Sequence, residues 1–166
     1  MYHSEDLRPG DILLCEGEVD VRDPLGLLMV WASDNRFQHA VLVGDGELIE
    51  AIDEVGVAPL DAYAPVGWRF TVAGATEEQL RRAVAAARRR VGEPYGYDGV
   101  LRDAHRLEGR IPLARRLDPH DVVSSALVCW AYEQAGIRLT WERLPTPGSL
   151  SHSPLLLGPR PWQLAS

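Results

Sequence analysis

The stretch that decides the fold is HAVLVGDGELIEAI, residues 39–52. Apolar runs on both sides surround the dipeptide Asp45-Gly46, which favours the tight turn of a β-hairpin. The stretch therefore predicts two neighbouring antiparallel strands. His39 lies at the start of the first strand, and Glu50 lies on the second.

Three further segments have the character of strands. Residues 12–15 are apolar and follow a Pro-Gly turn. Residues 55–57 form a short segment with two β-branched valines, and residues 68–72 are rich in aromatic and β-branched side chains. Cys15 falls within the first of these strands and is expected to lie in the core. Together with the hairpin, these segments predict an antiparallel sheet of about four to six strands.

Two segments have the spacing of helices. Thr76 and Gln79 form the signature of a capping box, and small and apolar residues continue the pattern until Gly92. Residues 124–135 place apolar side chains on one face and end at Gly136. Helices packed against an antiparallel sheet define an α+β fold class.

The other segments have weaker patterns. A short helix is expected to begin at Pro24, and the Pro- and Ser-rich stretch from Pro145 onward is expected to wrap around the surface. With 166 residues the chain has the length of one domain, so we expect residues 1–166 to form a single domain.

Charge and composition argue against several classes of function. A formal charge of −7 disfavours nucleic acid as the main partner, and no apolar run is long enough to span a membrane. Cys15 and Cys129 provide neither a disulfide framework nor the spacing of metal ligands, so no metal or other cofactor is expected. The acidic N-terminus lacks the pattern of a secretory signal. We therefore expect synthesis in the cytoplasm, with delivery to the cell wall or association with a virion as open routes.

Ser124 opens the predicted helix at residues 124–135. The unsatisfied amides and the dipole of a helix N-terminus stabilise a thiolate or an oxyanion. His39 can serve as the base from the neighbouring sheet, and the hairpin brings Glu50 close enough to orient the imidazole. These residues therefore predict a nucleophilic site composed of Ser124, His39 and Glu50.

Five ordered groups of motifs carry a resemblance to a known family. They are LRPGDIL (7–13), FQHAVLVG (37–44) with LIEA (48–51), GEPY (92–95), SSALV (124–128) with Ala131-Tyr132 and Gly136, and PGSL (147–150) with Ser153-Pro154. In this order they resemble the circularly permuted branch of the NlpC/P60 superfamily, which includes YiiX- and YebB-like cysteine hydrolases.

The resemblance implies a papain-like fold that cleaves amide bonds in cell-wall peptides, or acts on acyl groups, with a cysteine, a histidine and a polar third residue. His39 matches the base and Glu50 matches the orienting residue. Ser125, Tyr95 and Tyr97 become candidates for binding substrate or for holding an oxyanion, although packing explains the two tyrosines equally well.

Ser124 departs from the family, which usually has cysteine at this position. Three explanations remain open: an introduced Cys→Ser change that disables an enzyme, a natural loss of activity, and a serine hydrolase. The third is disfavoured because a serine hydroxyl is far harder to deprotonate than a thiol. Cys129 is a poor alternative nucleophile because it lies more than one turn inside the predicted helix.

The leading hypothesis is a cysteine-type amidase or peptidase that cleaves peptidoglycan stem peptides and is inactive or weakened with serine at position 124. One alternative is a lipid acyl hydrolase or acyltransferase of the same fold. Another is a non-catalytic component of a phage tail or cell-surface assembly. Taken without the ordered motifs, His39 would be a hydrogen-bonded core histidine, and Glu50 a surface carboxylate at the end of a strand.

Overall fold

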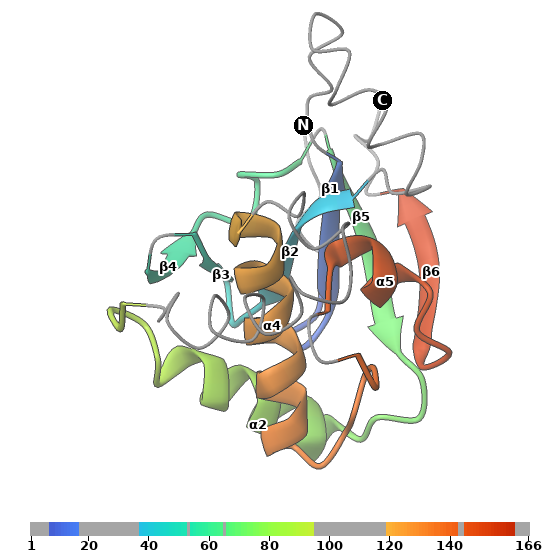
Figure 1. Cartoon of the computed structure of the whole chain (residues 1–166). Helices are drawn as coiled ribbons and strands as arrows, with labels where there is room; N and C mark the ends of the chain where they lie inside the picture. Colours follow the sequence, from blue (N-terminus) through green and yellow to red (C-terminus); the bar gives the residue numbers. More distant parts are fainter. Residues whose placement is uncertain are drawn as a thin grey trace, which may run out of the picture.

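The computed structural model describes residues 7–16, 37–52, 54–64, 66–94, 119–142 and 145–161. In these ranges six strands form one sheet in the order β4-β3-β2-β1-β5-β6, and all neighbouring strands are antiparallel (Figure 1). The strands are β1 (Ile12–Glu16), β2 (Phe37–Val43), β3 (Leu48–Ala51), β4 (Val55–Ala58), β5 (Gly67–Val72) and β6 (Leu156–Pro161).

The helices of the described residues are α2 (Glu77–Arg88), α4 (Pro119–Gln134) and the short α5 (Pro147–Ser151). The helix α4 lies against β2 and β3, and α2 packs against α4 (Figure 1). The predicted α+β class, with an antiparallel sheet packed against helices, is therefore confirmed.

The hairpin between β2 and β3 forms as predicted. Leu42 pairs with Ile49 and Val43 pairs with Leu48. Gly46 has a φ of 81°, a left-handed conformation that glycine adopts without steric cost. The turn therefore fixes the register that brings His39 and Glu50 to the same part of the sheet.

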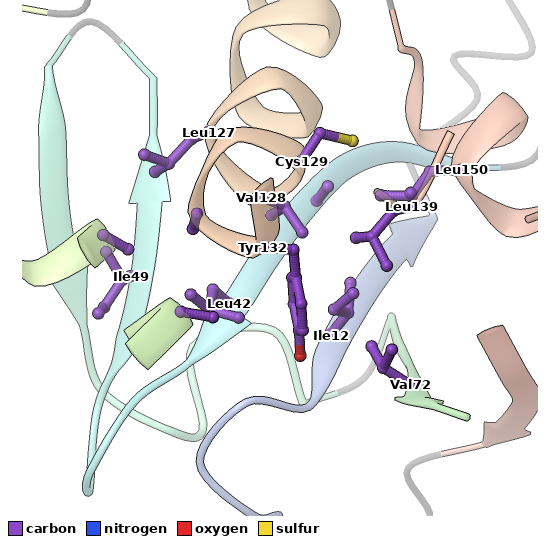
Figure 2. Close-up of a cluster of buried hydrophobic side chains, with 14 of the residues drawn as sticks. Ile12, Leu42, Ile49, Val72, Leu127, Val128, Cys129, Tyr132, Leu139 and Leu150 are labelled. Carbon is purple, nitrogen blue, oxygen red and sulfur yellow. The ribbon is translucent and has the colours of Figure 1, made fainter. Parts of the chain in front are cut away.

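The two faces of the sheet carry different apolar clusters because successive side chains of a strand point to opposite faces. The face covered by α2 and α4 holds the larger cluster. Figure 2 shows Tyr132 of α4 pointing onto this face beside Ile12 and Leu42, and all three side chains are fully buried. Burying a side chain such as Leu42 contributes about 1.5–3 kcal/mol to stability, so this face anchors α4 to the sheet.

A second cluster covers the opposite face. Its buried members are Leu13, Cys15, Val41, Val43, Leu48 and Ala64, with Tyr63 among the half-buried residues packed against them. The predicted core position of Cys15 is confirmed, since its exposed fraction is 2%. The residues after β4 therefore cover the face of the sheet that α4 does not.

The helix α2 begins as predicted. The side chain of Thr76 accepts a hydrogen bond from the amide of Gln79, whose side chain accepts one from the amide of Thr76. The helix ends at Arg88, earlier than predicted, and Gly92 lies in the turn that follows with a φ of 85°.

The helix α4 corrects one prediction. It begins at Pro119, so Ser124 is its sixth residue and does not open it. Proline is favoured in the first turn of a helix because its fixed φ suits that position and it has no amide hydrogen that would need a partner. His120 and Asp121 interrupt the apolar pattern in the first turn of this helix, so the pattern did not extend back to Pro119.

The C-terminal segment corrects another prediction, because it does more than wrap around the surface. Thr146 and Ser149 form a capping box at the start of α5, which contributes the fully buried Leu150 to the core. The strand β6 then pairs with β5 and forms one edge of the sheet. Proline interrupts the strand pattern of this segment but is tolerated in an edge strand.

Three predictions, the helix from Pro24 and the roles of Tyr95 and Tyr97, fall on residues outside the described ranges. Of the helices that the structure describes, none is both long and apolar enough to cross a membrane.

Candidate functional site

His39 and Glu50 are in direct contact. The distance between His39 Nε2 and Glu50 Oε2 is 2.7 Å, and both side chains are largely buried. His39 pairs with Cys15 across β1 and β2, so it shares the face of the sheet that carries Cys15 and Val41. The hairpin thus places the imidazole beside the carboxylate, as the sequence predicted.

Tyr63 also contacts this His39–Glu50 pair, a role that the sequence did not predict. It lies in the turn after β4, and its hydroxyl donates a hydrogen bond to Glu50 Oε2. Its ring lies 5.2 Å from the imidazole of His39, at an interplanar angle of 48°. A lone tyrosine in a turn carries no periodic or motif signal, so only the folded chain reveals this contact.

The pKa of Glu50 reflects competing effects. Burial raises this pKa, whereas the hydrogen bonds from His39 and Tyr63 and the positive charge of protonated His39 lower it, and the net result is a pKa below the ordinary value of 4.5. Burial, followed by the hydrogen bond to Glu50 and its negative charge, raises the pKa of Tyr63. Glu50 is therefore an ionised acceptor at neutral pH, and Tyr63 is a neutral donor.

Ser124 approaches β2 at the residue after His39. The backbone amide of Ala40 donates a hydrogen bond of 3.2 Å to Ser124 Oγ, and Ser124 is fully buried. Two covalent bonds separate the Ala40 nitrogen from the Cα of His39. The structure therefore brings position 124 beside the backbone of the candidate base, while the ring of His39 contacts Glu50 through Nε2.

The second ring nitrogen of His39, Nδ1, makes no hydrogen bond to the part of the chain that the structure describes. An imidazole that donates from Nε2 to a carboxylate has its unprotonated nitrogen at Nδ1. Ser124 meets the β2 backbone from the side of α4, whereas the ring of His39 lies on the opposite face of the sheet with Cys15. This tautomer can accept a proton at Nδ1 while Glu50 stabilises the resulting positive charge.

The position of Ser124 within α4 changes the predicted source of anion stabilisation. Because Ser124 and Ser125 are the sixth and seventh residues of the helix, their amides point to carbonyl groups one turn earlier. They are not among the unsatisfied amides at the helix start. The predicted oxyanion role of the Ser125 amide therefore lacks support, and Ser125 is fully buried in the helix. The observed donor to position 124 is the amide of Ala40.

Neither cysteine is poised to act as a nucleophile. Burial, with a smaller contribution from the charge of Glu50, raises the pKa of Cys15 to about 12. Burial, with smaller contributions from Glu133 and Glu142, likewise raises the pKa of Cys129 to about 12. Since the thiolate is the reactive form, both residues are expected to be inert thiols near neutral pH.

The site and sheet together define the class: an α+β protein with a His-Glu pair on a β-hairpin next to a helix-borne hydroxyl. No family model matches the chain, and no curated protein matches it. Among solved structures, the chain is similar to the metalloprotein YiiX from Escherichia coli O157:H7. The TM-score is 0.61 at 16% sequence identity, and the match covers 92% of this chain and 97% of YiiX. The chain therefore has a YiiX-like fold.

The metal that the description of YiiX implies finds no set of ligands in the described residues of this chain. Within those ranges no group of three or more His, Cys, Asp or Glu side chains could hold a metal ion. His39 and Glu50 contact each other directly and supply only two such groups.

Proposed function

We propose that this chain carries the site of a cysteine-type amidase or peptidase of the permuted NlpC/P60 type, with peptidoglycan stem peptides as substrates and serine at the nucleophile position. The observation that supports this function is the contact between His39 Nε2 and Glu50 Oε2, next to the backbone amide that binds Ser124 Oγ. The base and the orienting carboxylate are thus in contact on β2 and β3, and the side chain at the nucleophile position meets the β2 backbone one residue beyond the base.

The proposed reaction begins when the side chain at position 124 attacks the carbonyl carbon of the scissile amide. Its proton passes to His39 Nδ1, and His39 then gives a proton to the leaving nitrogen as the C–N bond breaks. A water molecule, deprotonated by His39, then attacks the acyl carbon, and His39 returns this proton to the side chain at position 124 as the bond to the acyl group breaks. Glu50 stabilises the imidazolium in both stages, and the amide of Ala40 supports negative charge on the atom at position 124.

Two features of position 124 limit the activity of the chain as it stands. A serine hydroxyl is deprotonated less readily than a thiol, and Ser124 is fully buried. Turnover therefore requires a conformational opening that admits the substrate carbonyl and brings position 124 to the imidazole, which lies on the opposite face of the sheet. It also requires cysteine at position 124 for a high rate.

The test compares three full-length proteins on labelled stem peptides and purified cell walls: the chain as it stands, Ser124→Cys, and Ser124→Cys with His39→Ala. We expect Ser124→Cys to release peptide fragments, with little or no release by the other two. A folded Ser124→Cys protein that releases nothing would contradict the proposal. Release of fatty acids from a lipid ester by the same protein would instead assign the acyl chemistry of the alternative hypothesis.

A non-catalytic role is a second candidate, supported by the contact of Ser124. The buried hydroxyl accepts a hydrogen bond from Ala40 and so contributes to packing α4 onto β2, which requires no reactivity. This role predicts that Ser124→Cys folds normally and that its thiol at position 124 does not react with iodoacetamide in the native protein. Alkylation of that thiol, lost with His39→Ala, would exclude this role.

A further inference from the structure

Tyr63 contacts both members of the proposed base-carboxylate pair. Its hydroxyl donates to Glu50 Oε2, the oxygen that also lies 2.7 Å from His39 Nε2. Its ring packs at a tilt against the imidazole. One side chain from the turn after β4 therefore constrains residues on β2 and β3.

The turn that carries Tyr63 is anchored to the sheet by its own hydrogen bonds. The carbonyl of Tyr63 accepts hydrogen bonds from the amides of Val66, at 3.1 Å, and Gly67, at 2.7 Å. Gly67 is the first residue of β5, and Ala64 is buried in the cluster on this face of the sheet. The backbone of Tyr63 is thus held in place by the fold, and its side chain reaches Glu50 from there.

The terminal torsion of a glutamate has broad, roughly two-fold preferences, so a carboxylate with one partner can turn either oxygen toward it. Two donors on the same oxygen remove this freedom. Of the described residues, His39 on β2, Tyr63 in the turn and Cys15 on β1 are the titratable groups that face Glu50. Cys15 is a neutral thiol near neutral pH and supplies no charge, so the hydroxyl of Tyr63 and the imidazole determine the state of Glu50.

We propose that Tyr63 is a positioning residue whose hydroxyl holds Glu50 as a carboxylate with Oε2 toward His39, and so keeps the imidazole oriented with Nδ1 free to accept a proton. The catalytic meaning of this arrangement rests on the proposed function. The effect of Tyr63 on the ionisation of Glu50 does not rest on the proposed function, and it can be measured in a protein without catalytic activity.

The first test uses Tyr63→Phe in the full chain with Ser124 in place. This substitution keeps the ring and removes only the hydroxyl. The matched control is Tyr132→Phe, because the buried hydroxyl of Tyr132 donates to the carbonyl of Gly10 on the other side of the sheet. Carboxyl ¹³C chemical shifts report the titration of Glu50 in each protein. We expect the midpoint to rise by about one pH unit in Tyr63→Phe and to stay unchanged in Tyr132→Phe. An unchanged midpoint in Tyr63→Phe would overturn the proposal.

The second test adds Tyr63→Phe to the Ser124→Cys protein. We expect kcat to fall about 10- to 100-fold with little change in KM. A change in KM alone, or the same loss in Tyr132→Phe, would overturn the positioning role. If Ser124→Cys itself shows no turnover, the proposed function fails, while the titration of Glu50 still decides whether Tyr63 controls it.

Discussion

The amide of Ala40 and the hydroxyl of Ser124 form a hydrogen bond of 3.2 Å that joins β2 to α4 across 84 positions of the chain. The contact is buried, and it meets β2 one residue beyond His39. Because the donor is a backbone group, it stays in place for any side chain at position 124. This hydrogen bond therefore locates the candidate nucleophile relative to the candidate base.

Replacing Ser124 with alanine removes the acceptor of a buried amide. We expect the free energy of unfolding to fall by about 1–3 kcal/mol. The loss should be smaller for Ser124→Cys, because sulfur still accepts a weak hydrogen bond from the amide and the alanine side chain accepts none. Denaturant unfolding measures the loss, and hydrogen exchange at the Ala40 amide should become faster. Ser125→Ala is the control, since it alters a neighbouring buried serine and should leave that exchange rate unchanged. Equal exchange rates at Ala40 in Ser124→Ala and the parent protein would contradict the assignment.

Glu50 should make the free energy of unfolding depend on pH. Its pKa in the folded protein lies below the ordinary value of 4.5, so between these two values the unfolded chain binds more protons than the folded one. The stability that ionised Glu50 contributes is complete above the unfolded pKa and is lost as the pH falls through the folded pKa. The difference in unfolding free energy between the parent and Glu50→Gln should therefore shrink between about pH 6 and about pH 3. Urea unfolding across this range tests the sign, and a pH-independent difference would refute it.

Glu50→Gln in the Ser124→Cys background should lower kcat by about 10²- to 10⁴-fold, because an amide cannot stabilise the imidazolium and can hold the wrong tautomer of His39. Glu47→Gln is the matched control. Glu47 belongs to the same hairpin, but its carboxylate pairs with Arg88 at the surface, 2.5 Å away. Rates of stem-peptide cleavage should be nearly unchanged by Glu47→Gln. Equal losses in the two variants would remove Glu50 from the mechanism.

Two strand-associated glycines should respond differently to alanine. A Cβ at Gly158 would lie 2.8 Å from the Phe70 ring and 2.9 Å from the Arg69 carbonyl oxygen, whereas a Cβ at Gly56 would meet no atom within 4 Å. We expect Gly158→Ala to cost about 1–3 kcal/mol of stability through the clash at the β5–β6 pair. Gly56→Ala should be neutral or slightly stabilising because it reduces the freedom of the unfolded chain. Thermal unfolding of both variants measures the two changes in stability. A larger loss of stability in Gly56→Ala than in Gly158→Ala would contradict the prediction.

Elements with strong local signals were predicted well. Asp45-Gly46 specified the turn between β2 and β3, and the capping box at Thr76 marked the start of α2. The start of α4 was placed at Ser124 and lies at Pro119, because an apolar stripe reveals the buried face of a helix but not a polar first turn. The strand β6 was missed because proline masks its pattern and its pairing with β5 is non-local.

The contacts of the candidate site also fall into two groups, those that local sequence predicted and those that only the folded chain shows. The sequence by itself determined that His39 and Glu50 would be neighbours, because a two-residue turn and alternating strands fix that proximity over a short stretch of chain. Only the tertiary structure decided that Tyr63 binds Glu50 and that Ser124 receives the amide of Ala40. Those contacts join segments that meet only when the turn after β4 and the helix α4 pack on opposite faces of the sheet. No local pattern of residues encodes that packing.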